Sequence, residues 1–117
     1  MKIAVQGSKS FNDYNVFLRA MGTALSRMGE DKSFEIYAAG PVNLNNMAIG
    51  YANISEDGFR GRGMTVSCHK RPLSWFEKNL EEMEHFAFFK KPGEENSQLF
   101  AQADKLLKEN AFLYEFK

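Results

Sequence analysis

Short apolar runs alternate with longer segments of helical periodicity along the chain. The runs, each expected to form a strand, are residues 3–5, 34–39, 64–68, 86–89 and 112–116. Between them, apolar residues recur at the spacing of one helix face over 16–28, 44–52, 75–83 and 99–111. About five strands alternating with four helices are typical of a mostly parallel sheet, because right-handed crossovers place helices on both of its faces. The sequence therefore predicts a three-layer α/β domain.

Turn residues lie between these elements. The second strand is expected to end at Gly40-Pro41, because proline has no N–H for further pairing. Either Asn43 or Asn45 is expected to cap the second helix, and Ser74 the third.

Residues 55–63 have three glycines and no periodicity, so we expect a loop there. Its arginines, Arg60 and Arg62, would either clamp a phosphate or lie free in a mobile loop.

Length, charge and cysteine content limit the class of protein. A chain of 117 residues that is 44% hydrophobic has material for one core, so we expect residues 1–117 to form a single domain. The 15 Lys and Arg balance the 15 Asp and Glu, which predicts neither a nucleic-acid nor a membrane partner. Cys68 is the only cysteine, and no leader or long apolar run is evident, so a cytoplasmic location is expected.

The first strand breaks abruptly at Gly7-Ser8 and is followed by a helical pattern. In an α/β fold this loop lies at the carboxyl edge of the sheet, where backbone N–H groups at the next helix favour anions. The loop predicts a phosphate-bearing, nucleotide-type ligand. The full dinucleotide fingerprint G-x-G-x-x-G is missing.

Loops that leave the carboxyl ends of parallel strands converge around one crevice. Four such segments are expected here: 7–12, 40–46, 69–71 and 92–98. Their glycines permit close backbone approach, their hydroxyls and amides form hydrogen bonds, and their cations match phosphate. The candidate ligand-binding residues are Gly7, Ser8, Lys9, Ser10, Phe11, Asn12, Gly40, Pro41, Asn43, Asn45, His69, Arg71, Gly93, Asn96 and Ser97. The glycines would equally serve to end strands, and the asparagines to cap helices.

Metal or nucleophile chemistry is not expected. Cys68 adjoins His69, but one cysteine and two widely separated histidines, His69 and His85, give no ligand spacing. We therefore expect no metal site, and we assign no cofactor and no catalytic residue from these side chains.

The opening residues 2–13, KIAVQGSKSFND, are similar to the "GSR-x-F-x-D" motif of the SLOG superfamily, with Lys9 in place of arginine. This Rossmann-like group includes LOG-type phosphoribohydrolases, YpsA-like proteins and the DprA core. Residues 38–48 occupy the place of the family's "SGGA-x-G-x-D-x-x-A" segment and retain Gly40 and Ala48, while Asn79 and Met83 resemble its "RN-x-x-M" stretch. The resemblance implies a Rossmann-like fold with a nucleotide-binding crevice.

Residues 92–100 depart from the family's "PGG-x-GT-x-x-E" motif, because two glycines and the glutamate are absent. In that family the glycines admit a phosphate and the glutamate serves glycosidic cleavage, so Glu94 and Asn96 would crowd the phosphate here. The resemblance therefore favours a protein that senses or sequesters a nucleotide-derived signal. The compactness of the chain also fits a phage or mobile-element protein.

Two other functions stay open at this point. One is a nucleoside 5′-monophosphate phosphoribohydrolase in which Glu94 or Glu95 replaces the missing carboxylate. The other is a structural or protein-interaction module. We also expect a homodimer or higher oligomer, because a helix bearing Trp75 and Phe76 would have more apolar surface than one small sheet covers.

Overall fold

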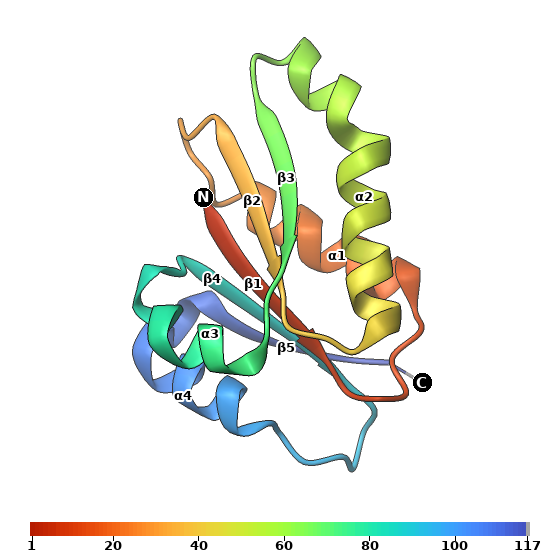
Figure 1. Ribbon diagram of the computed structural model, residues 1–117, viewed down its shortest axis with the longest axis vertical. Helices are drawn as coiled ribbons and strands as arrows, with labels where there is room; N and C mark the ends of the chain where they lie inside the picture. The colour runs from red at the N-terminus through yellow and green to blue at the C-terminus, as the bar shows by residue number, and fades with distance from the viewer. Residues whose placement is uncertain (117) are drawn as a thin grey trace.

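The computed structural model describes residues 1–116, in which strands and helices alternate (Figure 1). The strands are β1 (Lys2–Gly7), β2 (Ser33–Ala38), β3 (Thr65–Lys70), β4 (His85–Lys90) and β5 (Ala111–Glu115). The α-helices are α1 (Tyr14–Leu25), α2 (Val42–Gly61), α3 (Leu73–Asn79) and α4 (Gln98–Leu107). Single 3₁₀ turns follow α3 at Leu80–Glu82 and α4 at Lys108–Asn110.

All five strands are parallel, in the order β3-β2-β1-β4-β5, which confirms the predicted α/β fold. The central strand β1 pairs with β2 on one side and with β4 on the other; Ile3, for example, is opposite Ile36 and His85. The chain builds outward from β1 to β3 and then returns to add β4 and β5 on the other side. The reversal places a topological switch point between β1 and β4, where ligands commonly bind in open α/β sheets.

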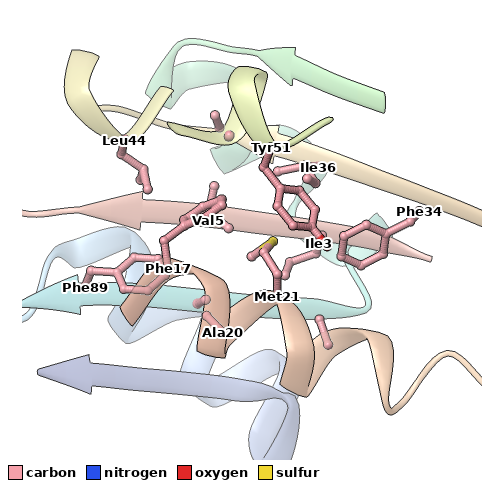
Figure 2. Close-up of a cluster of buried hydrophobic side chains, with 14 of the residues drawn as sticks. Ile3, Val5, Phe17, Ala20, Met21, Phe34, Ile36, Leu44, Tyr51 and Phe89 are labelled. Carbon is pink, nitrogen blue, oxygen red and sulfur yellow. The ribbon is translucent and has the colours of Figure 1, made fainter. Parts of the chain in front are cut away.

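The helices cover both faces of the sheet. Side chains of α1 and α2, including Phe17, Met21 and Leu44, pack on Ile3 and Val5 of β1 (Figure 2). On the other face, α3 and α4 bury Phe76, Leu99 and Phe100 against Ala4, Phe86 and Phe88. Because neighbouring strand residues point to opposite faces, a strand covered on both sides is a continuous apolar run, as residues 3–5 are.

The expectation of a loop over residues 55–63 was wrong, because α2 continues to Gly61. Tyr51 and Phe59 are both buried against the core at helical spacing, and this burial outweighs the low helix propensity of the glycines. Arg60 forms ion pairs with Glu56 and Asp57 on the exposed face of the helix. The helix ends before Gly63, which has a positive φ of 73°.

Two predicted helix caps were also wrong. Prolines Pro41 and Pro72 stand at the N-cap positions of α2 and α3, and neither helix has a side-chain cap bond. Asn45 instead reaches back and accepts a hydrogen bond from the Gly40 N–H at 2.9 Å.

The side chains of Trp75 and Phe76, which were the reason for expecting self-association, do not form an exposed apolar surface. The oligomeric state itself stays a prediction. Phe76 is fully buried, and Trp75 is half-buried and stacked on Tyr37 with ring centroids 5.0 Å apart. The most exposed large apolar side chains are Val42 and Ile54, both on α2. Within residues 1–116, no helix is both long and apolar enough to cross a membrane.

Candidate functional site

The four predicted loops all leave the carboxyl edge of the sheet, but the strand order separates them. The loops after β1 and β4 are immediate neighbours, and the loop after β2 is next to that of β1. The loop after β3 lies three strand spacings from that of β4, or about 14 Å. The structure therefore brings the first and last loops together at the switch point, whereas His69 and Arg71 belong to the end of the edge strand β3 and the loop that follows it.

The backbone of the first loop is engaged within the fold. The Gly7 N–H donates to the Gly40 carbonyl at 3.0 Å, and the Ser8 N–H donates to the Phe89 carbonyl at 2.8 Å. Helix α1 begins only at Tyr14, and its N-cap Asp13 accepts from the Val16 N–H. The predicted cradle of free N–H groups is thus absent at Gly7 and Ser8.

Phe11 was expected to contact the ligand, and the structure corrects this. Its side chain is fully buried and stacks on Phe89 at 4.5 Å between ring centroids. A Cβ built on Gly7 would lie 3.1 Å from the Cβ of Phe11, so the glycine makes room for this core residue rather than for a phosphate. The neighbours Lys9, Ser10 and Asn12 are exposed.

The loop after β2 is also fixed by internal contacts. Gly40 has a positive φ of 96°, which favours glycine, and the Gly40-Pro41 peptide bond is cis. Asn45 holds this turn through the Gly40 N–H, whereas Asn43 is exposed.

Donor groups from the first and last loops converge on one carboxylate, that of Glu94. Its Oε1 accepts from the Lys91 N–H at 2.6 Å and from the Ser8 hydroxyl at 3.1 Å, with the Ser10 hydroxyl farther away at 3.5 Å. The Lys90 ammonium donates to the Glu94 backbone carbonyl at 2.7 Å. We call the Ser8 and Ser10 hydroxyls and the Lys91 N–H the anion cradle. Its occupant is the chain's own carboxylate.

A tight turn aims Glu94 at the cradle. The Glu94 N–H donates to the Lys91 carbonyl at 3.1 Å across Pro92 and Gly93, and Gly93 has a φ of 90°. Proline followed by a glycine with positive φ is the pattern of a type II turn. Gly93 therefore has a conformational role here, independent of any ligand.

Beside the cradle, Gln6 of β1 and Ser97 join the two loops. The Ser97 hydroxyl donates to Oε1 of Gln6 at 2.5 Å and accepts from the Phe100 N–H at 3.0 Å, which caps α4. A pocket of about 240 Å³ opens at this place between α3 and α4. Its lining consists of Gln6, Leu73, Glu77, Ser97, Gln98, Leu99 and Gln102.

The sequence predicted Ser97 as a ligand-binding residue and placed Gln98 in the same crevice segment, but Gln6, Leu73, Leu99 and Gln102 were not predicted. Gln6 gave a signal in the sequence, because it is a polar side chain directly after the apolar run 3–5. In the structure it is only 8% exposed. Glu77, Gln98 and Gln102 are exposed helix residues with no such signal. Asn96 is exposed and lies outside the lining.

A second, shallower depression of about 360 Å³ lies on the α1 side of the same edge. Ser10, Asn12 and Lys91 line it together with Asp13 and Tyr14. It places two of the loop residues expected from the sequence, Ser10 and Asn12, beside Lys91, which was not among them.

At the far end of the edge, His69 and Trp75 stack on Tyr37, each with ring centroids 5.0 Å from it. The Arg71 guanidinium lies 5.6 Å from the Trp75 ring centroid, within the range of cation–π attraction. His69 and Arg71 are thus held by aromatic neighbours.

Two chemically reactive side chains lie on strands away from the loops, Cys68 on β3 and His85 on β4. Burial raises the pKa of the half-buried Cys68 thiol to about 11. His85 is fully buried and stacks on Phe112, and neither ring nitrogen has a hydrogen-bond partner within residues 1–116. Across the same residues, no group of three or more His, Cys, Asp or Glu side chains is arranged to hold a metal ion.

Comparison with known proteins found no matching family model, no matching curated protein and no matching solved structure.

Proposed function

We propose that this chain is a SLOG-type domain that binds a small nucleotide-type ligand across the β1–β4 switch point and senses or sequesters it. The observation that carries the proposal is the pocket beside Gln6 and Ser97, which opens where the strand order reverses. Ligands of open α/β sheets bind outside the carboxyl ends of the strands at this point.

The chemistry of the pocket suits a base or a sugar. Gln6, Gln98 and Gln102 offer amide donors and acceptors, while Leu73 and Leu99 provide apolar contact. Its volume of about 240 Å³ is below the roughly 300–1,000 Å³ of typical small-molecule sites. The pocket would therefore hold the nucleoside part, with the charged part of the ligand lying over the open edge.

Cations near the switch point would receive that charged part. Lys9 follows β1, and Lys90 and Lys91 end or follow β4. The net charge of the whole chain is zero, so this attraction acts only locally. Because Lys9 and Lys91 are exposed, the affinity should fall as salt is added.

The enzymatic alternative keeps one observation in its favour, which is the Glu77 carboxylate in the pocket lining. Glu94 is held by the anion cradle, and so Glu77 would be the acid or base of a phosphoribohydrolase. Release of free base over many turnovers, abolished in Glu77→Gln, would favour this function over sensing.

The experiment is a thermal-shift screen of nucleoside monophosphates, cyclic nucleotides and dinucleotides, together with mass spectrometry of small molecules released from the purified protein. A ligand at 100 times its Kd should stabilise the fold by about 2.7 kcal/mol. The stabilisation should decrease in Gln102→Ala and persist in Asn53→Ala, which removes an exposed amide from α2 on the other face. No stabilisation by any compound and no released ligand would leave the structural or protein-interaction module as the better interpretation.

A further inference from the structure

The occupied anion cradle carries a further inference, which rests on the proposed function. A carboxylate oxygen accepting from a backbone N–H and two hydroxyls makes the same kind of contacts as a phosphate oxygen. Glu94 Oε1 makes these contacts with donors that come from two different loops. The cradle is therefore built to bind an anion, whatever molecule supplies it.

The position of the cradle links it to the pocket. Gln6 is near the end of β1, and Ser8 follows the last residue of that strand, so the two residues lie two positions apart at the same edge of the sheet. Ser10 and Lys91 of the cradle also line the shallower depression on the α1 side of this edge. Ser97, which bonds Gln6, is three residues beyond Glu94, which bonds Ser8. Both contacts therefore join the chain around the end of β1 to the segment that precedes α4. A ligand in the pocket would extend its charged end toward the cradle.

The Glu94 carboxylate is also positioned so that it can leave the anion cradle. Glu94 is half-buried at the surface, and its charge is carried on a short turn formed around Pro92 and Gly93. The Lys90 ammonium, which now donates to the Glu94 backbone carbonyl, would remain beside the vacated cradle as a countercharge.

We propose that Glu94 is an internal competitor for the anion cradle, and that the phosphate of the ligand binds Ser8, Ser10 and the Lys91 N–H only by displacing it. Binding is then coupled to the opening of the turn at residues 91–94. The ligand class is a phosphate monoester, because a single terminal phosphate can offer an oxygen to all three donors.

The test measures binding of inorganic phosphate alone, by NMR titration of the backbone amides in phosphate-free buffer at fixed salt. Removing the competing negative charge in Glu94→Gln should tighten phosphate binding by about tenfold or more relative to wild type. Glu94→Ala, which also vacates the donors, should bind phosphate at least as tightly, with the largest shifts at Lys91. The matched control is Glu95→Gln, which removes the same charge from an exposed neighbour and should bind like wild type.

A second set of variants tests whether the gain in phosphate affinity depends on the hydroxyls of the anion cradle. Adding Ser8→Ala and Ser10→Ala to Glu94→Ala should abolish it, and far-UV circular dichroism shows that each variant retains its fold. If Glu94→Gln and Glu94→Ala bind phosphate no more tightly than Glu95→Gln, or if the gain survives loss of both serines, the proposal is wrong. Nucleotide binding by wild type without any gain in the variants would overturn this inference alone. A gain in phosphate affinity without nucleotide binding would overturn the proposed function alone.

Discussion

The Ser97 hydroxyl bridges α4 and β1: it caps the helix through the Phe100 N–H and donates to the side-chain carbonyl of Gln6 at 2.5 Å. Gln6 is only 8% exposed, so its Oε1 is largely withdrawn from water and relies on this contact. A single hydroxyl thus satisfies two groups at the switch point.

Ser97→Ala is expected to lower the free energy of unfolding by about 2 kcal/mol, because it removes the cap and leaves a buried acceptor without its donor. Ser97→Asn should recover the capping part of this loss. Urea unfolding followed by circular dichroism measures both variants. A loss below about 0.5 kcal/mol in Ser97→Ala would contradict the bridging role.

The stability of the fold should depend on the protonation of His85. Burial, with a smaller effect of the nearby Arg27 guanidinium, lowers the pKa of His85 from 6.5 to about 4. Between these values the unfolded chain binds the proton and the folded chain does not, so stability should fall as the pH falls from 6.5 toward 4. At about 1.36 kcal/mol per pKa unit, the total loss is about 3 kcal/mol. Above pH 6.5 this contribution is constant.

Chemical denaturation at a series of pH values checks this expectation. His85→Phe keeps a ring to stack on Phe112 and should flatten the dependence between pH 6.5 and 4. His69→Gln, at the half-exposed histidine, should leave it unchanged. An equally steep loss of stability in His85→Phe would assign the effect to other groups.

The Cys68 thiol should react slowly while the protein is folded. Burial raises its pKa from 9.0 to about 11, against a smaller opposing effect of Lys70. The thiolate is the reactive form, and at pH 8 its fraction falls by about 100-fold on folding. The rate of reaction with a disulfide reagent should therefore be at least that much lower in native buffer than in guanidinium chloride. Similar rates in the two conditions would show an accessible, reactive thiol.

Two glycine substitutions should have opposite effects. Gly7→Ala places its Cβ about 3.1 Å from the Cβ of the buried Phe11 and should destabilise the fold by about 1–3 kcal/mol. Gly58→Ala lies within α2 with nothing within 4 Å of the new Cβ and should stabilise it by about 0.5–1 kcal/mol. Thermal unfolding of the two variants measures the difference. An unchanged stability in Gly7→Ala would show that the Phe11 side chain moves easily to make room for the new methyl group.

The sequence predicted the sheet, both helix layers and the edge at which the loops meet, because apolar periodicity reflects burial directly. It did not predict the second half of α2. The glycines there indicated a loop, although the spacing of Tyr51 and Phe59 is that of one helix face. The strand order could not be derived from local pattern either. The loops that carry Ser8 and Glu94 are neighbours because of that order, which also puts Arg71 after the edge strand β3.

The orientations of the side chains at the site could not be predicted from local sequence patterns. Phe11 looked like a loop residue because its neighbours are polar, but the chain folds it back onto Phe89. Glu94 was expected to crowd a phosphate, and whether its carboxylate turns inward depends on the turn at Pro92 and Gly93. These orientations arise from three-dimensional contacts that no short sequence window contains.

The turn that carries Glu94 has a consequence for discrimination. A group tethered by a few residues competes at an effective concentration of about millimolar or above. Free phosphate or sulfate below that level would leave the cradle filled by Glu94. Only a molecule that also gains binding energy from the pocket at Gln6 and Ser97 would exceed this threshold, so the same carboxylate would act as a filter that rejects simple anions.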